Sequence, residues 1–282
     1  MPTKPKPTLA PATPQRSTGR SAENQPAGEA PQVAANAEAM SRAAADYLAA
    51  EIGKLPNALL CLATGASPAG TYELLAEKQQ SQPHLFDHVR LMKLDEWYGL
   101  QPTDPASSEL YLRQKLVTPL RVSPERFFGW NSRARNPQAE CQRVADWLAT
   151  QGRIDVCVLG LGINGHLGFN EPAHELSDGP HFARLSATSM NHSMLGAASG
   201  TVRFGFTMGM ANILQARKVI LLVSGQHKAA PLQRLLTRRI TTQFPASLLW
   251  LHPAFTVFCD RAAASGAPAH PKSRSAHPKS TP

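Results

Sequence analysis

Residues 160–172, GLGINGHLGFNEP, combine a histidine, an acid and four glycines in one short stretch. Glycine lets a backbone turn sharply and pass close to a ligand. The imidazole of His166 can accept or donate a proton, and Glu171 can hold this imidazole in one tautomer. A lone loop histidine more often makes only local hydrogen bonds, but the glycines and the nearby acid favour a catalytic role. The residue types and spacing do not favour a metal site.

Asp95 and Glu96 directly follow an apolar run at 89–94 that is typical of a strand. A carboxylate at a strand end that faces a closed site can have a raised pKa and act as a general base. A helix cap or a solvated loop acid is the commoner fate of a single Asp. The position alone therefore makes Asp95 only a candidate base.

Two other segments suit a phosphate group. In TGASP at 64–68, Gly65 permits close approach, and the N–H groups and hydroxyls of Thr64, Ala66 and Ser67 would surround a helix N-terminus. Ser67 is the expected N-cap, with Pro68 at the first helical position. Many tight strand-to-helix turns look like this without binding anything, and the segment is neither a Walker loop nor a dinucleotide fingerprint.

Lys228 follows a Ser-Gly-Gln turn at the end of another apolar run, which is also a favourable phosphate position. Most lysines are instead solvated surface charges. The histidines at 174, 181 and 192 show no pattern that assigns them a role.

The elements that must position these residues alternate along the chain. Apolar runs predict strands at 58–63, 89–94, 155–159, 201–207, 218–223, 247–251 and 255–259. Helical patterns cover 35–52, 68–78, 107–116, 137–150, 208–215 and 228–236. This alternation predicts a single α/β domain, doubly wound, with a mainly parallel sheet and helices on both faces. The candidate segments follow strands, and ligands bind at the carboxyl ends of strands in such sheets.

Composition limits the other possibilities. The net charge is +9, but residues 1–33 and 262–282 supply +5 of it and are too poor in large apolar side chains to fold, so we expect disordered tails around a domain at 34–261. No basic motif suggests nucleic acid, and no apolar run suggests a signal peptide or a membrane span. The four cysteines read as free thiols, three of them buried, in a cytoplasmic protein.

Longer segments carry a resemblance to a known family. LDEWYGL at 94–100, LGLGINGHLGFNEPA at 159–173 and the run at 207–228 resemble the glucosamine-6-phosphate deaminases. CLATGASP at 61–68 and PASLLWLH at 245–252 are similar to the galactosamine-6-phosphate isomerase branch. The resemblance covers roughly 35–260 and implies a Rossmann-like fold. It also implies a sugar-phosphate substrate and a reaction that needs no metal or cofactor. Whether the protein forms a homo-oligomer stays open.

The resemblance assigns roles to the candidate residues. His166 would assist ring opening of a 2-amino-2-deoxyhexose 6-phosphate, and Glu171 would orient His166. Asp95 would move the C2 proton to C1, after which the imine is hydrolysed and ammonia leaves. Lys228 and the 64–67 loop, through Thr64, Gly65, Ala66 and Ser67, would hold the phosphate.

The sequence departs from the family pattern at two positions. Asn164 stands where many deaminases have an Asp, and its amide would orient His166 without supplying charge. A phosphate-binding Arg of the family falls near Met190, and Ser186, Thr188, Ser189 or Arg184 are the expected substitutes.

Two other functions compete with deamination. A 6-phosphogluconolactonase shares the glycine–histidine loop, but the Asn-Glu-Pro at 170–172 and Trp97 speak against it. A non-catalytic sugar-phosphate sensor is disfavoured because Asp95, His166 and Glu171 are all present. Which amino-sugar epimer is used stays open, because we cannot identify the side chains that face C4.

Overall fold

The computed structural model describes residues 30–198 and 200–266. The expected disorder of the two tails falls mostly outside these residues. Two elements extend into the segments expected to be tails: strand β1 spans Gln32–Ala34 and helix α8 spans Arg261–Ala264. β1 pairs with the last strand, and the Asp260 side chain caps α8 through Ala263 N–H. These local contacts order residues that composition alone assigns to the tails.

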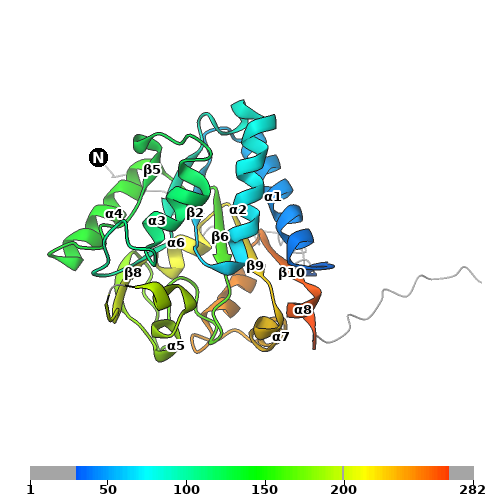
Figure 1. The fold of residues 1–282 in the computed structure, drawn as a ribbon. Coiled ribbons are helices and arrows are strands. Elements are labelled where there is room, and N and C mark those ends of the chain that lie inside the picture. Colours follow the sequence, from blue (N-terminus) through cyan, green and yellow to red (C-terminus); the bar gives the residue numbers. More distant parts are fainter. Residues whose placement is uncertain (1–29, 199, 267–282) are drawn as a thin grey trace, which may run out of the picture.

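A seven-stranded sheet forms the centre of the molecule (Figure 1), and every neighbouring pair of its strands is parallel. This confirms the expected α/β fold. In spatial order the strands are β1, β10 (Phe255–Asp260), β9 (Lys218–Val223), β6 (Val156–Gly160), β2 (Leu59–Leu62), β3 (Arg90–Lys93) and β5 (Phe127–Phe128).

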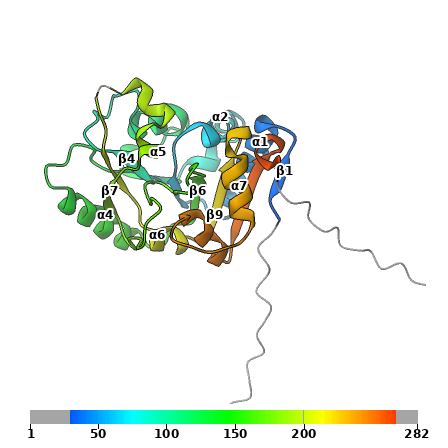
Figure 2. The same ribbon diagram turned by 90° about the horizontal axis from the view of Figure 1, so that it is seen from below.

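Helices cover both faces of this sheet because its strands are apolar on both sides. Leu60 and Leu62 of β2 pack in one core with α1, α2 and α3, whereas Leu59 and Cys61 pack in a second core with α4, α6 and α7. Figure 2 shows α1 and α2 on one side of the sheet and α4 and α6 on the other. The helices span Ala37–Lys54 (α1), Ala66–Ser81 (α2), Ser108–Leu112 (α3), Pro137–Gln151 (α4), Met210–Leu214 (α6) and Ala229–Leu236 (α7).

The strand order reverses between β2 and β6. From β2 the chain continues to β3 and β5 on one side, and from β6 it continues to β9 and β10 on the other. Connections that leave in opposite directions open a crevice at the carboxyl ends of the two strands, where open α/β sheets bind ligands. The loops that carry Thr64 and Gly162 start at this crevice.

A second, antiparallel sheet of three strands lies beside this crevice and consists of β4 (Asp95–Trp97), β8 (Phe204–Thr207) and β7 (His181–Arg184). Asp95 pairs with Thr207, and Thr207 pairs in turn with His181. The expected strand at 201–207 is therefore present from Phe204 onward but belongs to this small sheet. Sequence analysis predicted neither β4 nor β7.

Two local expectations were wrong. The segment at 247–251 is not a strand but part of a 3-10 helix, Pro245–Leu251, with Pro245 in its first turn. A short apolar run does not distinguish a strand from a buried helical turn. Helix α2 begins at Ala66, so its N-cap is Gly65 with φ of 113° and not Ser67. A residue with a side chain is strained at this φ, which explains a glycine there.

The remaining short elements connect these layers. They are the 3-10 turns Pro83–Phe86, Pro124–Arg126, Ser193–Ala197 and Gln226–Lys228, the π-helical turn Arg113–Val117, and helix α5 at Ala187–Met190. Cys61, Cys157 and Cys259 are buried free thiols, as expected. Within the described ranges, no helix is long and apolar enough to cross a membrane.

Candidate active site

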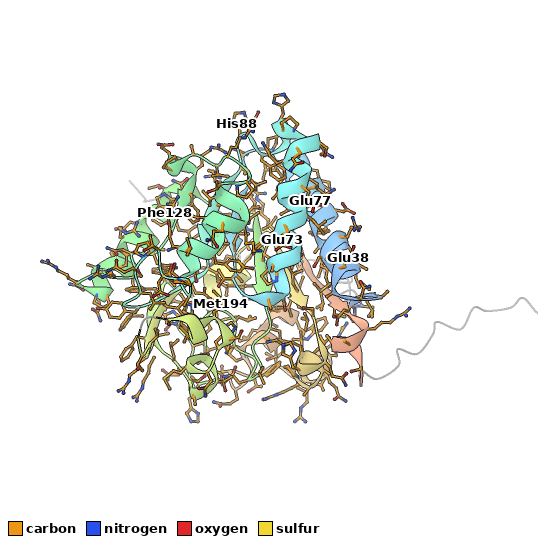
Figure 3. The ribbon with its side chains drawn as sticks, viewed as in Figure 1. Glu38, Glu73, Glu77, His88, Phe128 and Met194 are labelled. Atoms are coloured by element: carbon orange, nitrogen blue, oxygen red, sulfur yellow. The ribbon has the colours of Figure 1, made fainter. Side chains whose placement is uncertain are left out.

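A cavity of about 360 Å³ opens at the carboxyl ends of β2 and β6. Three separate loops and the second sheet line it: residues 63–68 after β2, residues 160–169 after β6, Lys228 after β9, and Asp95 with Trp97 from β4. Residues of α5 and of the 3-10 turn that follows it, among them Thr188, His192 and Met194, also line the cavity. Figure 3 shows Met194 beside the N-terminal end of α2. The structure therefore brings the sequence-predicted segments to one site.

Asp95 lies in the wall of this cavity with only 8% of its surface exposed. Burial, and then the neighbouring charge of Glu96, raise its pKa to about 7, although Ser108 and Lys93 act in the opposite direction. The Ser108 hydroxyl lies 3.5 Å from Asp95 Oδ1. A carboxyl group with this pKa changes between acid and base at neutral pH, which suits general-base chemistry.

Glu96 does not line the cavity; its carboxylate is buried and fixes the backbone next to Asp95. Lys93 Nζ is 2.8 Å from Glu96 Oε2 and 2.8 Å from Glu109 Oε2, and Lys93 is 2% exposed. Glu96 also accepts hydrogen bonds from the backbone N–H groups of Trp97, Ser108 and Glu109. A buried charge is stable only when it is paired and hydrogen-bonded in this way. The cluster fixes the end of β3 to the start of α3, so the backbone that carries Asp95 is held rigidly.

His166 lines the same cavity, and its imidazole contacts the carboxylate of Glu171. His166 Nδ1 lies 3.5 Å from Glu171 Oε2. Burial acts to raise the pKa of Glu171, but hydrogen bonds from His166 and Ser189, the charge of His166 and the Ser186 N–H outweigh it and lower the pKa to about 2. Glu171 is therefore a carboxylate at neutral pH and can stabilise a protonated imidazole.

Two polar side chains and one backbone N–H group hold Glu171 in place. Asn164 Nδ2 donates to Glu171 Oε2 at 3.0 Å, and the Ser189 hydroxyl donates to Glu171 Oε1 at 2.5 Å while lying 3.3 Å from His166 Nδ1. The backbone N–H of Ser186 donates to Glu171 Oε1 at 3.1 Å. Asn164 contacts His166 only at its backbone N–H, at 3.1 Å. Asn164 thus orients Glu171, not the imidazole ring as its sequence position suggests.

The glycines of this loop are explained by the side chains beside them. A Cβ atom on Gly162 would lie 2.5 Å from the His166 ring, and one on Gly165 would lie 2.1 Å from Phe244. Gly165 also has φ of 90°, which only glycine adopts readily. The loop therefore packs directly onto His166, and a larger residue at 162 would displace the imidazole.

Other groups that line the cavity suit an anion. The first N–H groups of α2 point from the Gly65–Ser67 turn, where a helix dipole favours negative charge. The Tyr111 hydroxyl donates to Gly65 O at 2.7 Å and fixes this turn. Lys228 Nζ donates to Leu161 O at 2.6 Å, which holds the ammonium group at the cavity wall, and burial lowers its pKa.

The expected substitutes for the family arginine lie in different environments. Arg184 is exposed on β7 and does not line the cavity, and Ser186 and Ser189 hold Glu171 instead. Of the four, Thr188 and Ser189 line the cavity. His192 also lines it, although its sequence context gave no signal.

Comparison with known proteins places the chain among sugar-phosphate enzymes. Residues 32–257 match the family model described as glucosamine-6-phosphate isomerases/6-phosphogluconolactonase. The chain is 43% identical over 220 residues to the "Putative deaminase AgaI" of Escherichia coli (strain K12), covering 78% of this chain and 87% of that protein. It is 36% identical to glucosamine-6-phosphate deaminase 1 of Bacillus subtilis (strain 168), covering 81% and 95%.

Solved structures agree with this placement. A monomeric glucosamine-6-phosphate deaminase of the NagB superfamily superposes with a TM-score of 0.79 at 35% identity, covering 83% of this chain and 98% of that one. The 6-phosphogluconolactonase of Leishmania guyanensis gives a TM-score of 0.69 at 22% identity, covering 86% and 100%, and shares the fold.

Proposed function

The chain belongs to the glucosamine-6-phosphate isomerase/6-phosphogluconolactonase family, and on that premise we propose that it isomerises and deaminates an amino-sugar 6-phosphate. The products are a ketohexose 6-phosphate and ammonia. The observation that carries the proposal is the presence, in one cavity, of a carboxyl group with a pKa near 7 and a carboxylate-held imidazole. The resemblance to proteins named as deaminases at 36–43% identity supports the same reaction.

The reaction begins with ring opening. His166 transfers a proton to the ring oxygen of the 2-amino-2-deoxyhexose 6-phosphate, and the C1–O5 bond breaks. The neutral imidazole then takes up the proton of the C1 hydroxyl, which leaves the open aldehyde and restores the protonated His166. Glu171, a carboxylate at neutral pH, stabilises the charged imidazole that donates this proton. Ser189 and Asn164 keep the carboxylate in position.

Asp95 then acts as the general base. Its carboxylate takes the proton from C2, forming an enolamine whose O1 takes up a proton released by the C2 amino group, and Asp95 then returns its proton to C1. The C2 amine is now an imine beside a CH₂OH group, and water adds to it so that ammonia leaves and a C2 ketone remains. The raised pKa makes Asp95 basic enough for the first step while still half-ionised near neutral pH.

The phosphate binds where the α2 N-terminus and Lys228 meet in the cavity. Thr64, Gly65, Ala66 and Ser67 supply backbone or hydroxyl donors, and Lys228 supplies charge. Such remote binding energy positions the sugar carbons between Asp95 and His166. No metal-ligand set is needed, because positioned side chains perform each proton transfer.

The test is release of ammonia by the purified protein from galactosamine 6-phosphate and glucosamine 6-phosphate in separate assays. Release from either substrate, with an equal amount of ketohexose 6-phosphate, supports the proposal, and the preferred substrate names the epimer. Hydrolysis of 6-phosphogluconolactone without ammonia release from either sugar would replace the proposal with a lactonase. Binding without any turnover would favour a sensor.

A further inference from the structure

His192 lines the cavity together with His166, Lys228 and the Gly65 turn. The residue starts the 3-10 turn Ser193–Ala197 after α5, and it is partly buried. If Gly65 carried a Cβ atom, that atom would lie 3.9 Å from His192 Cε1, so this edge of the ring faces the Gly65 turn. Lys228 and His166 are both near enough to influence its charge.

The contacts of the ring determine which nitrogen carries hydrogen. The backbone N–H of Met194 donates to His192 Nδ1 at 3.3 Å, which makes Nδ1 the acceptor. In a neutral imidazole the other nitrogen, Nε2, is then the donor. Burial, and then the charges of His166 and Lys228, lower the pKa of His192, so the neutral form prevails at neutral pH.

Cε1, the ring atom nearest the Gly65 turn, lies between the two nitrogens, and Nδ1 already accepts from the Met194 N–H. The Nε2–H is therefore the ring donor that remains for a ligand in the cavity. The Trp97 indole packs beside the ring, with centroids 6.0 Å apart, and Phe169 packs on Trp97 at 4.5 Å. Aromatic packing and the Met194 contact therefore fix the donor before a ligand arrives. A pre-oriented donor of this kind binds an anion with little loss of side-chain entropy.

We propose that His192 is a phosphate-binding residue of this site, donating its Nε2–H to a phosphate oxygen held between the α2 N-terminus and Lys228. The inference rests on the proposed sugar-phosphate substrate. It also supplies a phosphate donor in place of an arginine near Met190, since Arg184 and Ser186 do not line the cavity and the Ser189 hydroxyl, which does, is bonded to Glu171. Thr188 is then the other side chain of this segment available to the phosphate.

The test measures binding of glucitol 6-phosphate, an acyclic phosphate that cannot be turned over, by titration calorimetry. We expect His192→Ala to raise its Kd about 10- to 100-fold, the usual loss for a hydrogen bond to a charged group. His192→Gln retains a side-chain N–H at similar reach and should stay within about threefold of wild type. His174→Ala, an exposed histidine outside the cavity, is the matched control and should bind as wild type.

Kinetics provide a second measurement. His192→Ala should lower kcat/KM for the amino-sugar phosphate, mainly through a higher KM, because the residue binds the phosphate and contacts no reacting atom. An unchanged Kd in His192→Ala, an equal loss in His192→Gln, or a fall in kcat at constant KM would overturn the inference, as would a wild-type protein that does not bind glucitol 6-phosphate. A wild type that binds this ligand but releases no ammonia would instead refute the proposed function and leave the role of His192 standing.

Discussion

The side-chain amide of Asn164 donates a hydrogen bond to Glu171 Oε2 at 3.0 Å, on the oxygen that faces His166. The amide is a neutral donor to a carboxylate, so it stabilises the charged form of Glu171. An Asp at 164, the residue that the resemblance to the deaminases leads one to expect there, would place two carboxylates in contact and remove this donor.

We therefore predict that Asn164→Asp lowers activity in this chain instead of improving it. The change loses one hydrogen bond and adds like-charge repulsion, so Glu171 holds the imidazolium less firmly, and we expect kcat/KM to fall about 10-fold or more. Asn164→Ala removes the donor without adding charge and should cost less. Steady-state ammonia release measures both variants, and an Asn164→Asp enzyme at or above wild-type activity would contradict this role.

The pH dependence of the rate should report Asp95. The base must be ionised, so kcat/KM should rise with pH and level off above about 7, the pKa of Asp95. The affinity of glucitol 6-phosphate over the same pH range separates the ionisation of the substrate phosphate from that of the enzyme. A profile that is flat from pH 5.5 to 8 after this correction would exclude Asp95 as the base.

Asp95 should also limit stability at neutral and alkaline pH. Its pKa rises from 3.8 in the unfolded chain to about 7 in the folded protein, so the unfolded state holds fewer protons between these values and stability falls as pH rises through this window. At about 1.4 kcal/mol per pKa unit, ionising Asp95 costs at most about 4 kcal/mol. Asp95→Asn should therefore raise the free energy of unfolding at pH 8 by roughly 1–3 kcal/mol, which urea denaturation measures as a higher midpoint.

The same comparison at pH 4 supplies the internal control. At pH 4 the folded Asp95 is almost fully protonated and the unfolded side chain, with a pKa of 3.8, is roughly half protonated, so the stabilisation by Asp95→Asn should shrink to a small fraction of its value at pH 8. An Asp95→Asn variant that is less stable than wild type at pH 8 would show that burial and the charge of Glu96 do not make ionised Asp95 destabilising.

Gly162 should be intolerant of any side chain, because its Cβ would lie 2.5 Å from the His166 ring. We predict that Gly162→Ala displaces the imidazole and lowers kcat by about 100-fold or more, while folding is retained. Gly179→Ala is the matched control, since a Cβ there meets nothing within 4 Å. Ammonia assays with circular dichroism distinguish the cases, and a Gly162→Ala enzyme of normal activity would refute close packing onto His166.

The sequence predicted those parts of the site that follow directly from strand ends. Asp95, His166 and Lys228 each follow a strand of the main sheet, and a parallel sheet brings such ends to one edge. Sequence analysis assigned no role to His192 and expected Ser189 at the phosphate, whereas the Ser189 hydroxyl is bonded to Glu171. These two residues come from α5 and the turn after it. Their positions depend on how this segment folds over the cavity, and no local pattern encodes that tertiary packing.

The predicted bounds and types of some elements were wrong where the local sequence fits more than one structure. Ser67-Pro68 resembles a helix start, but Gly65 takes the capping position with a φ that only glycine tolerates. β7 is half-exposed and short, so its residues lack the apolar alternation that predicts a strand. The run at 247–251 is apolar because it is buried, and its secondary structure is decided by packing and by Pro245.

The most direct test of the whole account compares wild type with Asp95→Asn in one experiment, with ammonia release and glucitol 6-phosphate binding measured on the same preparations. The wild type should release ammonia and ketohexose 6-phosphate in equal amounts from an amino-sugar 6-phosphate. Asp95→Asn should bind glucitol 6-phosphate with unchanged affinity but turn over at least about 1,000-fold more slowly. Turnover by Asp95→Asn within about tenfold of wild type, or no ammonia from the wild type at all, would contradict the account.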